Sequence, residues 1–320
     1  MSTTPSPTVG AALPAAESAG GAAGSSPRKG TLLRKERRAG WLLVAPAALH
    51  IGLWVGVPLL VAIVLSFTRY DLPRKPTFNG IQNYLDAFGQ ESFRKAIVNT
   101  FIMTGVAVPV SMLLAISIAV LLNMGLRGQA FFRTAVFMPH ITATVAIAVV
   151  WLWIYNPDAG GLFNRIIGVF NLGPLSWLGS PDLALGSVIL VLIWQGIGIK
   201  MLIYLAALQG LPTDVVKAAK IDGANAAQRF WHITVPLLRP ATFFVLVTSI
   251  ISSFQVFDQI FILTSGGPAN STTVITYQIY LSAFEASRMG YASAQSVILF
   301  LFLIVLAIVS RRVVGGTDAH

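Results

Sequence analysis

The chain has 320 residues, of which 55% are apolar and only 11% are charged. Soluble globular domains carry about a quarter charged residues, so this composition excludes an ordinary soluble protein and indicates a membrane protein. The absence of cysteine excludes disulfides, thiolate metal sites and cysteine nucleophiles. The net charge of +10 is expected to mark cytoplasmic loops rather than nucleic-acid binding, because membrane proteins concentrate Lys and Arg there.

The first 40 residues are predicted to form a disordered, basic cytoplasmic tail. Residues 1–26 are rich in Ala, Gly, Ser and Pro, and they lack the apolar core that a signal peptide requires. Basic residues then precede the first apolar stretch directly: Arg28, Lys29, Arg34, Lys35, Arg37 and Arg38. This cluster predicts an N-terminus that stays in the cytoplasm.

Apolar stretches follow that are long enough to cross the hydrocarbon core, which takes about 20 helical residues. We predict six spans: residues 41–67, 96–123, 131–155, 183–208, 242–264 and 292–309. The fold class is therefore all-α, a polytopic permease-like domain over residues 41–313, with a second cytoplasmic tail at 314–320. With both termini inside, fourteen Lys and Arg lie on the cytoplasmic side and seven outside, so the positive-inside rule favours this orientation.

The most informative segment is the predicted cytoplasmic loop over residues 211–240, LPTDVVKAAKIDGANAAQRFWHITVPLLRP. A short helix is expected to begin at Thr213 and to stop at Asp222 and Gly223. A second is expected from about Asn225 until prolines turn the chain into the next span. A helix, a glycine bend and a helix suit insertion into a cleft on a soluble partner.

This loop resembles the EAA loop of ABC importer permeases: Glu-Ala-Ala, three residues, Gly, nine residues, Ile, one residue and Leu-Pro. The same frame here reads Lys217-Ala218-Ala219, Gly223, Ile233 and Val235-Pro236, so Lys217 replaces the glutamate and Val235 the leucine. The resemblance implies that the loop couples the chain to an ATPase. The coupling residues that it implies are Lys217, Ala218, Ala219, Asp222, Gly223, Phe230, Ile233 and Pro236.

Further segments are similar to permeases of the maltose-type sugar transporters. They are the stretch from Phe78 to Tyr84, Asn99-Thr100, Arg133 with Met138-Pro139, and the stretch from Phe257 to Pro268. The resemblance implies a type I ABC importer permease with six transmembrane helices in a bacterial inner membrane. It implies as partners two ATP-binding cassette subunits, a second homologous permease, an extracytoplasmic solute-binding protein and a small-molecule solute.

The sequence contains no phosphate-binding GxxxxGK[ST] loop, so ATP is expected to be bound and hydrolysed by other chains. No cofactor, metal site or catalytic residue is predicted, which disfavours a membrane-embedded enzyme. Within the family, a sugar or oligosaccharide is the expected solute, and glycerol 3-phosphate or a glycerophosphodiester is the alternative. An ion-coupled secondary transporter, which would use buried carboxylates, and a scaffold without transport remain as alternatives from other classes.

Polar and aromatic residues within the spans are candidates for the solute path: Trp153, Trp194, Gln195, Lys200, Gln255 and Asp258. Charged side chains in hydrocarbon usually face the protein interior or water. Lys200 follows two glycines that are expected to loosen the helix, and the alternative is that it reaches to the membrane interface. For Asp258 the alternative is a structural cap, and for the tryptophans an interfacial position instead of stacking on a sugar ring.

Overall fold

The computed structural model describes residues 29–125, 127–158 and 160–315, and their side chains except at 29–39, 213, 216, 217 and 311–315. The chain divides into two compact units at Val57 and Pro58. The first unit holds helix α1 (Lys29–Ile51) and the π-helical turn η1 (Gly52–Gly56). Residues 1–28 and 316–320 of the predicted tails lie outside the described residues. Residues 29–40 of the predicted disordered tail are helical and form the first part of α1, whose first proline is Pro46.

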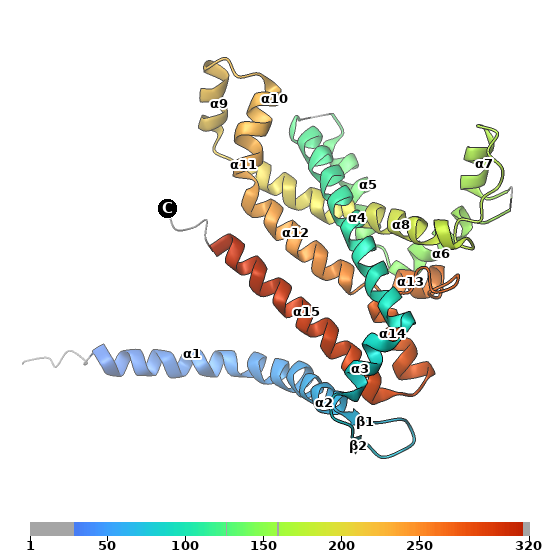
Figure 1. The fold of residues 1–320 in the computed structure, drawn as a ribbon. Coiled ribbons are helices and arrows are strands. Elements are labelled where there is room, and N and C mark those ends of the chain that lie inside the picture. The colour runs from blue at the N-terminus through green and yellow to red at the C-terminus, as the bar shows by residue number, and fades with distance from the viewer. Residues whose placement is uncertain (1–28, 126, 159, 316–320) are drawn as a thin grey trace, which may run out of the picture. The chain divides into compact units, whose positions relative to one another are not determined.

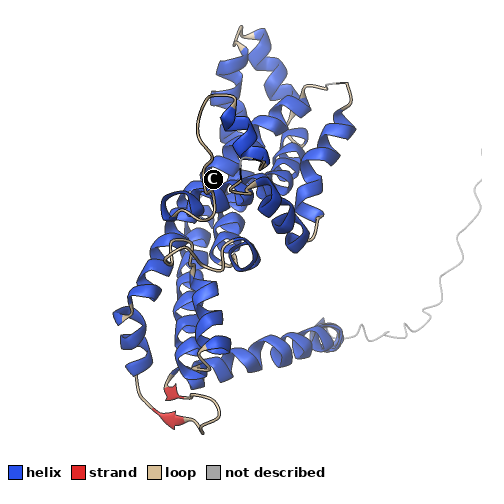
Figure 2. Cartoon of the chain, turned by 90° about the vertical axis from the view of Figure 1, so that its right-hand side faces the viewer, coloured by secondary structure: helices blue, strands red, loops and turns tan. Residues whose placement is uncertain are grey.

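Almost everything described in the second unit is helical (Figure 2). The membrane-length helices are α4 (Glu91–Asn123), α8 (Pro181–Gln209) and α15 (Met289–Gly315). The other helices are α2 (Val57–Ser66), α3 (Gln82–Gly89), α5 (Gln129–Ile141), α6 (Thr144–Ile154), α7 (Leu162–Gly168), α9 (Thr213–Ile221), α10 (Ala226–Arg229), η2 (Phe230–Thr234), α11 (Val235–Leu237), α12 (Arg239–Phe254), α13 (Asp258–Leu263), α14 (Ile275–Tyr280) and η3 (Leu281–Glu285).

The core of the second unit forms where α4 lies against α8 and α12. One face of α4 carries small buried residues: Thr100, Thr104, Ala107, Ser111, Ala115 and Ala119. Their spacing of three or four residues places them on one side of the helix. Small side chains let helix backbones approach closely, which is how helices pack in a membrane, where lipid supplies no hydrophobic drive.

A two-stranded hairpin closes one end of the second unit (Figure 1). Strands β1 (Thr68–Arg69) and β2 (Thr77–Phe78) pair antiparallel, with Thr68 opposite Phe78. Buried Asn83 donates to the carbonyls of Ser66 and Thr68 at 2.8 Å each, and so ties α3 to the end of α2. Asn83 belongs to the sequence segment from Phe78 to Tyr84, which therefore has a structural role.

Two of the six predicted spans are not single straight helices. Four helical stretches are long and apolar enough to cross a membrane: Gly40–Ser66, Glu91–Asn123, Pro181–Gln209 and Met289–Ser310. The third predicted span is α5 and α6, bent by 99° at Thr142 and Ala143, and the fifth begins as α12 but ends at Phe254. Pro139 lies inside α5, which continues to Ile141 before the chain bends.

Candidate functional site

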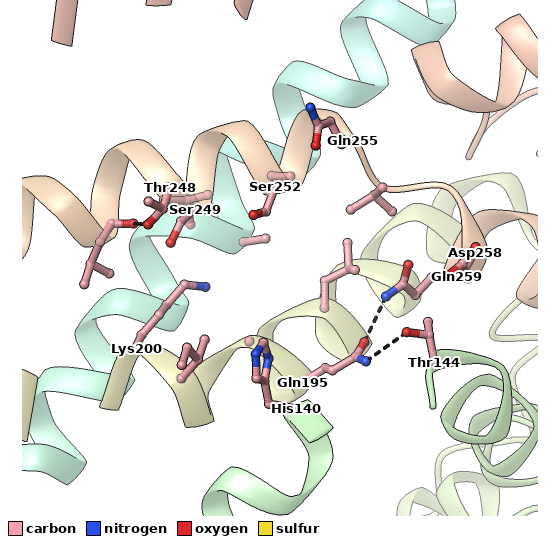
Figure 3. A pocket seen from close by; sticks show the side chains of 18 of the residues that line it. His140, Thr144, Gln195, Lys200, Thr248, Ser249, Ser252, Gln255, Asp258 and Gln259 are labelled. Atoms are coloured by element: carbon pink, nitrogen blue, oxygen red, sulfur yellow. Dashed lines mark hydrogen bonds between the residues drawn. The ribbon is translucent and has the colours of Figure 1, made fainter. Parts of the chain in front are cut away.

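A cavity of about 670 Å³ lies between α4, α8 and α12, and α5, α6 and α13 contribute to its wall. Four residues predicted for the solute path line it: Gln195 and Lys200 from α8, Gln255 from the break after α12, and Asp258 from α13. Figure 3 shows Lys200 at one end of this cavity and Asp258 at the other. The structure thus brings together four side chains from a stretch of the chain in which the first, Gln195, and the last, Asp258, are 63 positions apart.

The wall formed by α12 is a row of hydroxyl groups. It consists of Thr248, Ser249, Ser252 and Ser253. They repeat at intervals of four, which places them on one helical face, the face toward the cavity (Figure 3). Sequence reasoning did not assign them to the site, although polar residues at helical spacing in an apolar span were a usable signal.

Lys200 is held inside the bundle. Its Nζ donates to Ser111 Oγ at 2.7 Å, and Ser111 on α4 is fully buried. The ammonium also lies 2.9 Å from the place that a Cβ on Gly196 would occupy. Gly196 therefore gives room for the side chain to lie back along α8, and the helix itself runs unbroken rather than loosened. In this structure the Lys200 side chain therefore points to α4 and does not extend to the membrane interface.

The other end of the cavity carries amides and a carboxylate. Gln259 Nε2 donates to Gln195 Oε1 at 2.9 Å, and Gln195 Nε2 donates to Thr144 Oγ1 at 3.4 Å (Figure 3). This chain of hydrogen bonds links α13, α8 and α6. Asp258 is exposed and forms no ion pair with any described residue. Its carboxylate and the amides offer acceptors and donors suited to the hydroxyl groups of a solute.

Neither tryptophan of the predicted solute path lines the cavity. The Trp153 side chain is 65% exposed and that of Trp194 is 41% exposed. Trp194 packs edge-on against buried Trp151, with ring centroids 5.6 Å apart. Both rings thus lie on the outer surface of this chain. Such a position suits tryptophans at the membrane interface better than tryptophans that stack on a sugar ring.

The loop over residues 211–240 forms a helical hairpin, α9 to α11, that projects at one end of the second unit (Figure 1). Helix α9 ends at Ile221, and Gly223 has φ of +81°. The amide of Ala224 donates to the Ala219 carbonyl at 3.0 Å, and that of Gly223 to the Lys220 carbonyl at 3.2 Å. This pair of bonds is the Schellman motif, which requires a left-handed residue and favours glycine. The predicted bend at Gly223 is therefore present.

The second arm of the hairpin begins with a capping box. Asn225 Oδ1 accepts from the Gln228 amide at 2.8 Å, and Gln228 Oε1 accepts from the Asn225 amide at 2.8 Å. This arm then continues through Phe230, Ile233 and Pro236 into a 64° bend before α12. The Lys217 side chain lies outside the described residues.

Very little of the hairpin packs against the chain. None of its described residues from 214 to 237 is buried, Ile221 is 86% exposed and Trp231 is 65% exposed. Ala218 and Asp222 are also exposed, and Ala219, Phe230, Ile233 and Pro236 are half-buried. An ordered hairpin with apolar side chains in the open presents a surface that a partner can cover.

Comparison with known proteins agrees with this arrangement. The trehalose/maltose transport system permease protein MalF of Thermococcus litoralis is 32% identical over 281 residues, covering 87% of this chain and 94% of that protein. The lactose transport system permease protein LacF of Rhizobium radiobacter is 34% identical over 274 residues, covering 84% and 91%.

A solved structure shares the fold. In the crystal structure of a bacterial ABC transporter involved in the import of the acidic polysaccharide alginate, one chain matches with a TM-score of 0.74. The match has 24% identity and covers 88% of this chain and 99% of that one. The predicted all-α fold of an ABC importer permease is thereby confirmed.

The family model of the inner membrane components of binding-protein-dependent transport systems matches residues 84–316, which include the cavity and the hairpin. The prediction of a transport permease in the inner membrane is confirmed, and a secondary transporter or scaffold finds no support. The chain belongs to the family of binding-protein-dependent transport system inner membrane components.

Proposed function

We propose that this chain is one of two permease subunits of an ATP-driven importer, and that the α9–α11 hairpin docks on one of two separate ATPase subunits. The observation that carries the proposal is the ordered hairpin, bent at left-handed Gly223 and without a buried described residue between 214 and 237, that coincides with the EAA frame. In this proposal both termini and the hairpin are cytoplasmic, and an external binding protein delivers the solute.

The hairpin is joined to the cavity wall by continuous backbone. Its second arm runs from Ala226 to Leu237 and turns by 64° directly into α12, whose hydroxyl row lines the cavity. Because a helix transmits displacement as a rigid element, movement of the hairpin by closing ATPase subunits would move the hydroxyl row. ATP hydrolysis in separate subunits would then switch the cavity between its outward-facing and inward-facing states.

The solute that this site supports best is a sugar or oligosaccharide. The named relatives are permeases for maltose, trehalose and lactose. The cavity offers hydroxyl and amide groups from Thr144, Gln195, Gln255 and Gln259 beside apolar wall residues such as Phe244. That combination suits a ring with polar edges and apolar faces.

Gly223→Val is the variant that tests the coupling role. A β-branched residue at φ of +81° is strained by about 1 kcal/mol or more, so the Schellman bend should deform. We expect uptake by the complete transporter to fall at least tenfold and recovery of the ATPase in a pull-down to fall with it. Membrane insertion should be unchanged, since the spans do not depend on this bend.

Ala226→Val is the matched control, because Ala226 is exposed in the same hairpin and lies inside regular helix. It should retain near-normal uptake and ATPase recovery. Normal transport by Gly223→Val, with or without a defect in the control, would show that the bend does not couple this chain to an ATPase.

A further inference from the structure

We propose that the cavity takes an acidic saccharide, whose carboxylate or phosphate group binds the Lys200 ammonium while its hydroxyl groups face Gln195, Gln259 and Asp258. The proposal rests on the proposed function and names the chemical class of its solute. It follows from the surroundings of Lys200, from the way the side chain is held, and from the opposite charges at the two ends of the cavity.

Lys200 has a hydrogen-bond partner but no counter-ion among the residues that the structure describes. An ammonium has three donors, and the one described bond goes to Ser111 Oγ at 2.7 Å. Ser111 is a neutral partner, and its single hydroxyl proton is already donated to the Val108 carbonyl at 3.0 Å. No carboxylate of a described residue lies within 4.0 Å of this ammonium. A charged side chain within a span usually pairs with an opposite charge or faces water, and an anionic solute would supply the counter-ion.

The position of this charge is built into the helices. Gly196 leaves the space into which the ammonium folds, and fully buried Ser111 fixes its end against α4. Figure 3 shows the ammonium directed into the cavity, toward the stretch of α12 that carries Ser249 and Ser252. The two remaining donors are therefore available to a group that enters between α8 and α12.

Asp258 makes the two ends of the cavity different. Its carboxylate lies at the end opposite Lys200 and would repel a second acidic group there (Figure 3). The same carboxylate and the Gln195–Gln259 pair accept hydrogen bonds from hydroxyl groups. A solute with one acidic end and one hydroxyl-rich end matches both ends of the cavity, and a neutral sugar leaves Lys200 without an anion.

The chain contains no natural cysteine, so one introduced thiol can report the potential beside Lys200. In membranes that carry the complete transporter, Ser252→Cys is treated with a negatively charged or a positively charged methanethiosulfonate reagent. Labelling is measured on this chain alone, and each rate is divided by the rate with a free thiol in solution. We expect the negative reagent to be favoured at least tenfold, and Lys200→Gln to reduce this preference at least fivefold.

Lys75→Cys is the control, because Lys75 is exposed in the β1–β2 hairpin and does not line the cavity. Its reagent preference should not respond to Lys200→Gln. A normalised preference near one at Ser252→Cys, or a preference that survives Lys200→Gln, overturns the inference. Failure of the small neutral reagent methyl methanethiosulfonate to label Ser252→Cys also overturns it, because the cavity would then be closed to solutes.

Protection of Ser252→Cys tests the solute class. D-galactose, D-galacturonate and galactose 6-phosphate are compared at equal concentration against the neutral reagent. At least one acid should slow labelling threefold or more while galactose does not, and Lys200→Gln should remove the effect. Protection by galacturonate alone assigns a carboxylate, and protection by the phosphate ester alone assigns a phosphate. Equal protection by galactose, or no protection by either acid, refutes the acidic solute. This result is independent of the proposed function, which a loss of uptake in Gly223→Val would still support.

Discussion

Two glycines of α8, two positions apart, have different structural roles. A Cβ on Gly196 would meet only the flexible end of Lys200, at 2.9 Å. A Cβ on Gly198 would meet the backbone of α5, at 2.6 Å from the Val136 carbonyl oxygen and 2.8 Å from Phe137 Cα. Their position before Lys200 in the sequence predicted that both glycines would loosen α8. The second instead lets α5 and α8 approach closely, as small residues do between membrane helices.

Gly198→Ala should therefore destabilise the protein. The backbone of α5 cannot yield as a side chain can, so the two helices must separate, at a cost of about 1 to 3 kcal/mol. We expect a lower midpoint in thermal unfolding of the purified transporter in detergent. Gly186→Ala is the control in the same helix, because a Cβ there meets nothing within 4 Å. It should leave stability unchanged or raise it, since alanine favours helix by about 0.5 to 1 kcal/mol. Equal midpoints for the two variants would contradict the close approach.

At the scale of elements, two of the predicted spans are broken. The break between α5 and α6 comes three residues after Pro139, which itself lies inside α5. The break after α12 contains neither Gly nor Pro, and residues 255–257 read as part of an apolar run. There the Thr276 hydroxyl donates to the Val256 carbonyl, and Phe257 packs on Tyr277 and Tyr280. These contacts come from residues about twenty positions downstream and hold the chain where the helix ends, so they leave no local pattern from which the end could be predicted.

Thr276→Val tests this cause of the break. The substitution keeps the shape of the side chain but leaves the Val256 carbonyl without its partner, which costs about 1 to 3 kcal/mol where water cannot replace it. A lower unfolding midpoint is expected. Thr248→Val is the control, because the Thr248 hydroxyl bonds carbonyls of its own helix, at 2.7 Å from Phe244 O. If both variants unfold at the same temperature, the hydroxyl of Thr276 does not hold the break.

The hairpin and the cavity differ in how far the sequence predicts them. The hairpin is built from local signals, Gly223 at a helix end and Asn225 at a helix start, so its bend could be placed from sequence. The cavity is assembled from six helices, and its lining residues are spread from Ala107 to Gln259. Polar residues within spans indicated four of its members, but which face of α12 it uses and which tryptophans it excludes depend on packing.

For the whole molecule, the two bent helix pairs decide the topology. Six spans result if each pair crosses the membrane, and four result if each pair returns to the side from which it entered. In the first case the β1–β2 hairpin and the α9–α11 hairpin lie on opposite sides, in agreement with their places at opposite ends of the second unit (Figure 1). In the second case both hairpins lie on the same side. The coupling proposal requires the first.

Sided labelling tests whether the α5–α6 pair crosses the membrane, and the cysteine-free chain makes the labelling direct. Lys75→Cys lies between β1 and β2, and Ala227→Cys lies in α10, and both positions are exposed. In intact spheroplasts, a membrane-impermeant maleimide should label Lys75→Cys and leave Ala227→Cys unlabelled. In inverted membrane vesicles the pattern should reverse, because the positive-inside rule and six crossings both place α10 in the cytoplasm. A permeant maleimide must label both sites in both preparations, which controls for burial of either thiol. Labelling of both sites from the outside would mean that the α5–α6 pair does not cross the membrane, and the α9–α11 hairpin would then lie where no cytoplasmic ATPase could reach it.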